Sequence, residues 1–171
     1  LQCYCDPDEM GKNGLYTVTS LYLDTDDWMC VSSVEEGFRE RFKLRLRHYD
    51  AGSARFAEIK ERIGATILKT RAKVDVRDWP ALVAGEPLQH TVLSEGLARY
   101  IQMRDAMRLQ PAVWVAYDRE AWTSAFGDGV RVTFDRNIRA QPGDRDTPYA
   151  APSAWQRLST PTVLELKFFT A

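Results

Sequence analysis

The stretch Arg41-Phe42-Lys43-Leu44-Arg45-Leu46-Arg47 decides the fold. Side chains of a β-strand alternate between its two faces, so this stretch places four cations on one face and three apolar side chains on the other. Like charges in a row repel one another, and the cationic face therefore requires water or a polyanion beside it. The stretch predicts a strand with one side for a core and one side for solvent or an anion.

Charged faces recur in the two strands predicted next, over residues 55–62 and 67–74, with loops at 51–53 and at Gly64-Ala65. The side chains that share the charged faces are Glu58, Lys60 and Arg62 in the first strand and Lys69, Arg71 and Lys73 in the second. Three consecutive strands thus repeat one pattern. The repetition predicts an antiparallel sheet with one strongly charged face.

The remaining sequence predicts further strands, and helices to cover the sheet. The other predicted strands are 16–24, 113–119, 130–136 and 162–168, with a hairpin turn at Gly127-Asp128-Gly129. A short helix is predicted to begin at Asp78-Trp79-Pro80, with Asp78 as its N-cap, and to end at Gly85. A longer helix is predicted over 94–107, and a long loop over 141–159. A single domain over residues 1–171 accounts for all of them.

Composition and charge exclude several classes of protein. The formal net charge is -1, so the basic face is a local feature, which argues against a general nucleic-acid-binding protein. No apolar stretch approaches the roughly 20 residues needed to cross a bilayer, and no signal-peptide pattern is present. Cys3, Cys5 and Cys30 lack zinc-site spacing, and only His48 and His90 are histidines. We expect free thiols, no histidine-rich metal site and a soluble, cytoplasmic protein, and the sequence shows no membrane partner.

For any single strand, a charged face exposed to solvent is the simpler interpretation. Taken together, the strands are satisfied by a closed antiparallel β-barrel with apolar side chains outward against helices and charged side chains in the lumen. Arginine and lysine bind phosphate oxygens, and Glu58, Asp135 and Glu165 offer hard oxygen ligands for Mg²⁺ or Mn²⁺. The pattern predicts an α+β fold that binds a triphosphate or a longer phosphate chain with a divalent metal.

Seven motifs stand in a characteristic order: YTVTSLYLDT (16–25), RFKLRLRHY (41–49), FAEIKER (56–62), KTR (69–71), PAVWVAYDREA (111–121), RVTFD (131–135) and VLELK (163–167). In this order they resemble the VTC domain, the catalytic module of polyphosphate polymerases and one of the triphosphate tunnel metalloenzymes of the CYTH-like superfamily. That family usually begins with a strand of alternating Glu and Lys followed by a helix, and continues with a helix after VLELK. Neither is found in this sequence. The resemblance implies a tunnel-shaped barrel that lacks the first strand and the last helix.

The resemblance also implies a reaction, in which the terminal phosphoryl group of ATP is added to a growing polyphosphate chain with Mn²⁺ or Mg²⁺. The implied catalytic residues are Arg45, Arg47, Lys60, Lys69 and Arg71. Lys43, on the same strand face as Arg45, joins the implied substrate-binding residues Arg119, Arg131 and Lys167. Glu165 is the implied metal ligand, with Glu58 and Asp135 as supporting candidates.

Two other functions fit the same residues. A triphosphatase of the same superfamily would use water in place of the phosphate chain as the attacking group, and both reactions need the same lumen charges. A non-catalytic domain that binds polyphosphate or inositol phosphates would keep the basic faces without chemistry. Glu165 argues against the second alternative, because anion binding alone needs no metal-binding carboxylate.

Overall fold

The computed structural model describes residues 3–50, 54–159 and 161–168. Within these ranges the chain forms nine β-strands and three α-helices. The strands are β1 (Cys5–Pro7), β2 (Leu15–Asp24), β3 (Glu40–Tyr49), β4 (Arg55–Ile63), β5 (Thr66–Val74), β6 (Gln110–Ser124), β7 (Arg131–Pro142), β8 (Gln156–Arg157) and β9 (Val163–Lys167). The helices are α1 (Met29–Glu35), α2 (Trp79–Ala84) and α3 (Glu95–Ala106), with short 3₁₀ helices η1 (Val76–Asp78) and η2 (Pro152–Ala154).

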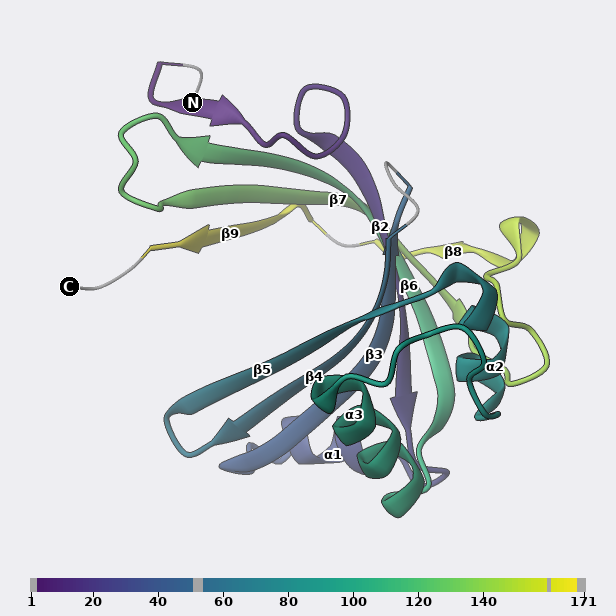
Figure 1. Ribbon diagram of the computed structural model, residues 1–171. Helices are drawn as coiled ribbons and strands as arrows, with labels where there is room; N and C mark the ends of the chain where they lie inside the picture. The colour runs from purple at the N-terminus through teal and green to yellow at the C-terminus, as the bar shows by residue number, and fades with distance from the viewer. Residues whose placement is uncertain (1–2, 51–53, 160, 169–171) are drawn as a thin grey trace.

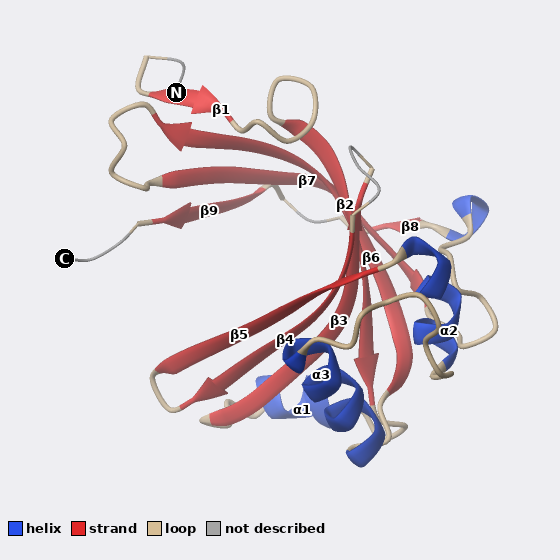
Figure 2. Ribbon diagram, in the orientation of Figure 1, coloured by secondary structure: helices blue, strands red, loops and turns tan. Residues whose placement is uncertain are grey.

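All the strands belong to one antiparallel sheet, in the order β5-β4-β3-β2-β6-β7-β8, with β1 paired to β6 and β9 paired to β7. The sheet bends strongly, so that β3, β4 and β5 form one leaf and β7 and β9 form the other (Figure 1). The helices lie along its outer side, where α3 packs against β4 and β5 (Figure 2). The inner side of the bend therefore stays free of helices.

The prediction of a closed β-barrel is wrong, although the α+β class and the antiparallel pairing are confirmed. Among the described residues, β5 pairs only with β4 and β9 pairs only with β7, which leaves the sheet two free edges. A barrel closes only when its edge strands hydrogen-bond to one another. The short strand that precedes β2 does not bridge these edges, because β1 pairs with β6.

The hydrophobic core lies between the outer side of the sheet and the helices. Leu44 and Leu46 of β3 are fully buried there, against Trp79 of α2 and against Leu97 and Tyr100 of α3. Burial of a leucine side chain contributes about 1.5–3 kcal/mol, so this apolar face fixes which way β3 turns. The core thereby confirms the apolar side that alternation predicts, and it directs the cations of β3 to the inner side.

The predicted helices and strands are all observed, whereas β1 and α1 were not predicted and β6 is longer than the predicted 113–119. Two further predictions besides the barrel need correction. Gly85 ends α2 in a left-handed conformation, and the Ser94 hydroxyl accepts a hydrogen bond from the Leu97 N–H at the start of α3. The predicted loop over 141–159 is only partly correct, because β7 extends to Pro142 and the segment contains η2 and β8. The loop predicted at 51–53 lies outside the described residues.

Two of the three cysteines, Cys5 and Cys30, are buried, and Cys3 is exposed. Cys3, Cys5 and Cys30 are free thiols. The ring of His48 packs edge-on against Trp79, and burial, followed by the nearby charge of Arg55, lowers the pKa of His48 to about 4. No helix in these ranges is both long and apolar enough to span a membrane.

The second correction concerns Asp78, which makes no side-chain hydrogen bond to the start of α2. Its buried carboxylate instead accepts the backbone N–H groups of Gln89, His90 and Thr91 at 3.0, 2.8 and 2.5 Å. Burial acts to raise the pKa of Asp78, but these hydrogen bonds outweigh it and lower the pKa to about 2. Asp78 therefore fastens the segment between α2 and α3 rather than capping a helix.

We expect Asp78→Asn to lower the melting temperature at pH 7, because an amide oxygen and an NH₂ group cannot accept three N–H donors. The carboxylate pKa is lower in the folded state, so its contribution is complete above the unfolded value of about 3.9 and is lost as the pH falls toward 2. Thermal unfolding at pH 7, 4 and 2.5 measures this, with the exposed Asp146→Asn as control. Equal melting temperatures for Asp78→Asn and wild type at pH 7 would contradict it.

Candidate functional site

The inner side of the bent sheet holds a basic pocket of about 480 Å³, lined by nine cationic and two acidic side chains. The cations are Lys43, Arg45, Arg47, Lys60, Lys69, Arg71, Arg119, Arg131 and Lys167, and the acids are Glu58 and Glu165. Every residue predicted for the site lines this pocket except Asp135, which lies behind Arg119. The fold thus brings together charges from β3, β4, β5, β6, β7 and β9.

Strand register sorts the cations of one leaf into two rows. Lys43, Lys60 and Lys69 stand directly opposite one another on β3, β4 and β5, and we call them the lysine row. Two residues further along the strands, about 7 Å away, Arg45 and Arg71 stand on either side of Glu58. Both rows consist of directly opposed residues on β3, β4 and β5, but the second row has a carboxylate at its centre and the lysine row has none.

Glu58 organises the arginines. Its Oε2 accepts the Nε–H of Arg45 at 2.6 Å, its Oε1 lies 3.1 Å from Arg71 Nε, and Arg47 Nη1 lies 3.8 Å from Oε2. Burial acts to lower the pKa of Arg45, but Tyr22 and Glu58 together raise it. Three guanidinium groups engage Glu58, so this carboxylate positions cations, and its predicted role as a metal ligand stays a prediction.

The lysine row is uncompensated. None of Lys43, Lys60 and Lys69 forms an ion pair with any residue that the structure describes. Burial lowers the pKa of Lys60, and the charges of Lys69, Lys43 and Arg45 lower it further, while Glu165 on the opposite leaf acts to raise it. Like charges directly opposite one another on neighbouring strands are destabilising. The row is therefore a place where an anion would relieve repulsion.

The opposite leaf supplies cations held by their own carboxylates. Arg119 donates to both oxygens of Asp135, at 2.7 and 2.8 Å, and Arg131 donates to Asp8 and to the Tyr16 hydroxyl. Burial acts to lower the pKa of Arg119, and the bonds to Asp135 outweigh it and raise the pKa. Asp135 is thus paired with Arg119, and its predicted support of a metal stays a prediction.

Glu165 is the carboxylate that remains available to a metal. Its side chain is 46% exposed, with Lys167 Nζ at 3.3 Å and Arg119 Nη2 at 3.9 Å. The described part of the chain contains no group of three or more His, Cys, Asp or Glu side chains that could hold a metal by themselves. A single carboxylate fits an ion that takes its other ligands from phosphate oxygens and water, which is how Mg²⁺ is often bound. The donors present fit a metal that arrives with phosphates.

Four tyrosines in the pocket were not predicted as site residues: Tyr16, Tyr22, Tyr49 and Tyr117. The hydroxyl of Tyr22 accepts from Arg45 Nη1 at 3.0 Å, and that of Tyr49 accepts from Arg71 Nη2 at 2.9 Å. Alternation along residues 16–24 does put Tyr22 on one face with Ser20. The prediction of site residues relied on charged side chains, however, and the tyrosine phenol is uncharged. These hydroxyls hold the guanidinium groups in place.

Fold and site together define an α+β protein whose bent antiparallel sheet holds a basic pocket on its inner side. The chain belongs to the VTC domain family, whose model matches residues 1–170. Membership suggests a function related to polyphosphate, and the family is associated with polyphosphate polymerase.

A search of curated proteins found no match. Among solved structures, the chain is similar to the structure of PH1819 protein from Pyrococcus Horikoshii OT3, with a TM-score of 0.40 and 14% identity. The similarity covers 72% of this chain and 57% of that chain.

Proposed function

We propose that this protein transfers the terminal phosphoryl group of ATP to a polyphosphate chain in the basic pocket. The lysine row is the observation that carries the proposal. Three opposed ammonium groups, none of them in an ion pair with a residue that the structure describes, repel one another, and a chain of phosphates offers a matching row of negative charges. A ligand with a single charge would leave most of the row uncompensated.

The residues divide between binding and charge neutralisation. In the reaction, a terminal oxygen of the polyphosphate attacks the γ-phosphorus of ATP, the bond from that phosphorus to the bridging oxygen breaks, and ADP leaves with the bonding electrons. Lysines and arginines hold both phosphate groups in line and neutralise the oxygens of the transferred group. Glu165 would hold Mn²⁺ or Mg²⁺, which supplies additional neutralisation of phosphate oxygens when bound.

The direct test is incubation of the chain with ATP and MnCl₂, followed by gel separation of phosphate polymers. A ladder of long polymers supports the proposal. Release of inorganic phosphate without polymers would overturn it in favour of a triphosphatase, in which water is the attacking group. Tight binding of polyphosphate with neither product would indicate a non-catalytic binding domain.

Glu165→Gln is expected to reduce metal-dependent turnover about 100-fold or more, because loss of one metal-binding oxygen weakens charge neutralisation in the transition state. Binding of tripolyphosphate without metal should be unchanged or tighter, since a negative charge has left the pocket. Glu61→Gln is the matched control, because Glu61 pairs with Arg99 outside the pocket. Unchanged turnover in Glu165→Gln would exclude the metal-binding role.

A further inference from the structure

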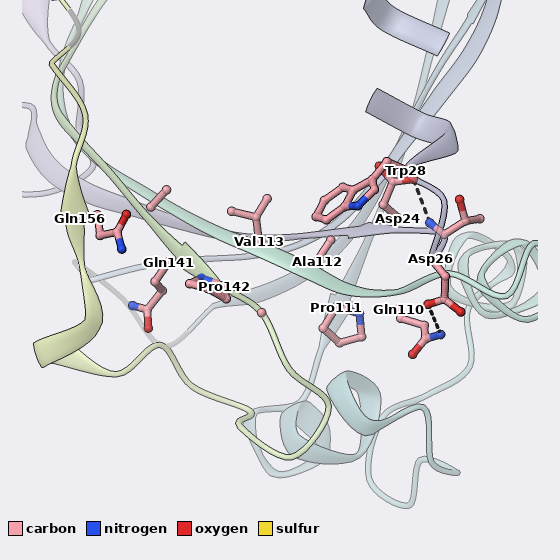
Figure 3. A pocket seen from close by; sticks show the side chains of 13 residues that line it. Asp24, Asp26, Trp28, Gln110, Pro111, Ala112, Val113, Gln141, Pro142 and Gln156 are labelled. Carbon is pink, nitrogen blue, oxygen red and sulfur yellow. Dashed lines mark hydrogen bonds between the residues drawn. The ribbon is translucent and has the colours of Figure 1, made fainter. Parts of the chain in front are cut away.

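Two more pockets continue the basic pocket past the lysine row, at the end of the sheet where β2 ends and β6 begins. The first, of about 350 Å³, lies beside α1, and it shares Tyr22 and Lys43 with the basic pocket. The second, of about 700 Å³, lies along the first residues of β6 (Figure 3). The two are joined by shared lining residues: Asp24, Trp28, Ala112 and Val113. The three pockets therefore adjoin one another, with Trp28 on the wall shared by the last two, and we call these two pockets together the hollow.

Trp28 is exposed and held in an unusual conformation. Its side chain is 51% exposed, and its backbone has φ 60 and ψ 37, in the left-handed region that bulky residues rarely adopt. The backbone is fixed on both sides: the Trp28 N–H donates to the Thr25 carbonyl at 3.0 Å, and the Trp28 carbonyl accepts from the Ser32 N–H at 2.9 Å. The indole in Figure 3 projects over Ala112 and toward Val113 instead of into the core. Trp28 therefore combines a strained backbone conformation with an aromatic ring that lies beside the hollow.

Acidic side chains outnumber cations around Trp28. Asp24 and Asp26 line the larger of the two pockets, and Glu35 lines the smaller one together with Lys43. The buried Asp24 carboxylate already accepts backbone N–H groups at the start of α1, so Asp26 is the carboxylate at the rim of the larger pocket. An uncharged ring that carries an amino group suits this end better than a phosphate group. Asp26 accepts the side-chain N–H of Gln110 at 2.8 Å, so a carboxylate and an amide lie together at the edge of the hollow. Apolar walls, an open indole and acceptors at the rim suit a purine.

We propose that Trp28 is the stacking platform for the base of the nucleoside triphosphate whose phosphates lie along the lysine row. The inference rests on the proposed function in taking a nucleoside triphosphate as substrate. Adenine offers a flat π face to the indole and an exocyclic amino group to Asp26. With the base at the Lys43 end of the pocket, the phosphate chain that accepts the phosphoryl group enters from the other end, beside Arg131.

Calorimetric titration of ATP and of tripolyphosphate, both without divalent metal, tests the proposal. Trp28→Ala should weaken ATP binding about 10-fold, which is typical of the loss of base stacking, and leave tripolyphosphate binding unchanged. Trp28→Phe keeps an aromatic face and should retain most of the affinity for ATP. Phe126→Ala removes an aromatic side chain that is even more exposed than Trp28 and lines none of the three pockets, and it is the matched control.

The outcomes separate this proposal from the proposed function. Equal weakening of both ligands in Trp28→Ala, or no weakening of either, overturns the platform while the binding of tripolyphosphate by wild type still supports the basic pocket. If wild-type protein binds neither ligand, both proposals fail. Circular dichroism of each variant identifies any misfolded protein. If Trp28→Ala is misfolded, Trp28→Leu decides, because leucine keeps apolar bulk without an aromatic face: weaker ATP binding by Trp28→Leu than by Trp28→Phe supports the platform, and equal ATP binding by the two overturns it.

Discussion

Lys60→Met is expected to weaken tripolyphosphate binding about 10- to 100-fold and, in the same protein, to raise the melting temperature. The loss of binding follows from removal of a charge-assisted hydrogen bond to phosphate, which contributes about 1.5–3 kcal/mol. The gain in stability follows from the position of Lys60 between Lys43 and Lys69: burial lowers the pKa of Lys60, and the charges of Lys69 and Lys43 lower it further. Methionine keeps most of the length of the side chain and removes its charge, and with it the repulsion.

Two measurements test the predicted loss of affinity and the predicted gain in stability. Calorimetry at two ionic strengths gives affinity, which should depend less on salt in Lys60→Met than in wild type. Thermal unfolding without ligand gives stability. Lys73→Met is the matched control, because Lys73 is an exposed lysine of the neighbouring strand that does not line the basic pocket. A lower melting temperature for Lys60→Met, or unchanged affinity, would show that the lysine row is an ordinary solvated face.

Glu58→Gln is expected to destabilise the protein by about 2–4 kcal/mol, because it leaves a cluster of guanidinium groups without their shared counter-ion. The side chain of Glu58 is only 13% exposed, and its partners Arg45 and Arg71 are 26% and 47% exposed, so solvent screens part of the repulsion. A polyanion should replace the lost charge. Tripolyphosphate is therefore expected to raise the melting temperature of Glu58→Gln more than that of wild type.

Urea unfolding with and without tripolyphosphate measures both effects. Glu61→Gln, on the same strand, breaks the Glu61–Arg99 pair, in which Arg99 is 51% exposed, and should change stability by less than about 0.5 kcal/mol. If Glu58 were a metal ligand, the variant would keep its stability and lose the dependence of turnover on Mn²⁺. That result would exclude the role in organising the arginines.

The two variants test whether repulsion between cations in the basic pocket lowers the stability of the folded protein. Lys60 adds to this repulsion in the lysine row, and Glu58 reduces it between the neighbouring arginines. Residues that serve function at the expense of stability are expected to stabilise a protein when they are replaced. A structural salt bridge network would instead lose stability in both variants.

Much of the site could be predicted, because alternation in a strand is a local property. Once Leu44 and Leu46 are assigned to a core, Lys43 and Arg45 must face the other way, whatever the strand pairs with. Contacts between distant segments could not be predicted in this way. The ion pair of Arg131 with Asp8 joins residues 123 positions apart, and no periodicity in the chain indicates it.

Local patterns also mislead where a side chain has a choice of partners. Asp78 stands before a proline-containing helix, as an N-cap residue does, yet its carboxylate binds the N–H groups at 89–91, which only the folded chain places beside it. Trp28 is similar. Nothing in the sequence marks a tryptophan for a left-handed backbone, and the surrounding turn imposes it.

The sequence by itself determined the strands, the faces that carry their charges and the resemblance to the VTC domain, because each depends on the identity and spacing of neighbouring residues. Only contacts between distant segments show that the sheet remains open, that Glu58 and Asp135 pair with arginines, and that Lys43 and Trp28 line one pocket. Register between strands and the bend of the sheet arise from hydrogen bonds and packing between distant segments. These forces set which charges meet and which stay unpaired.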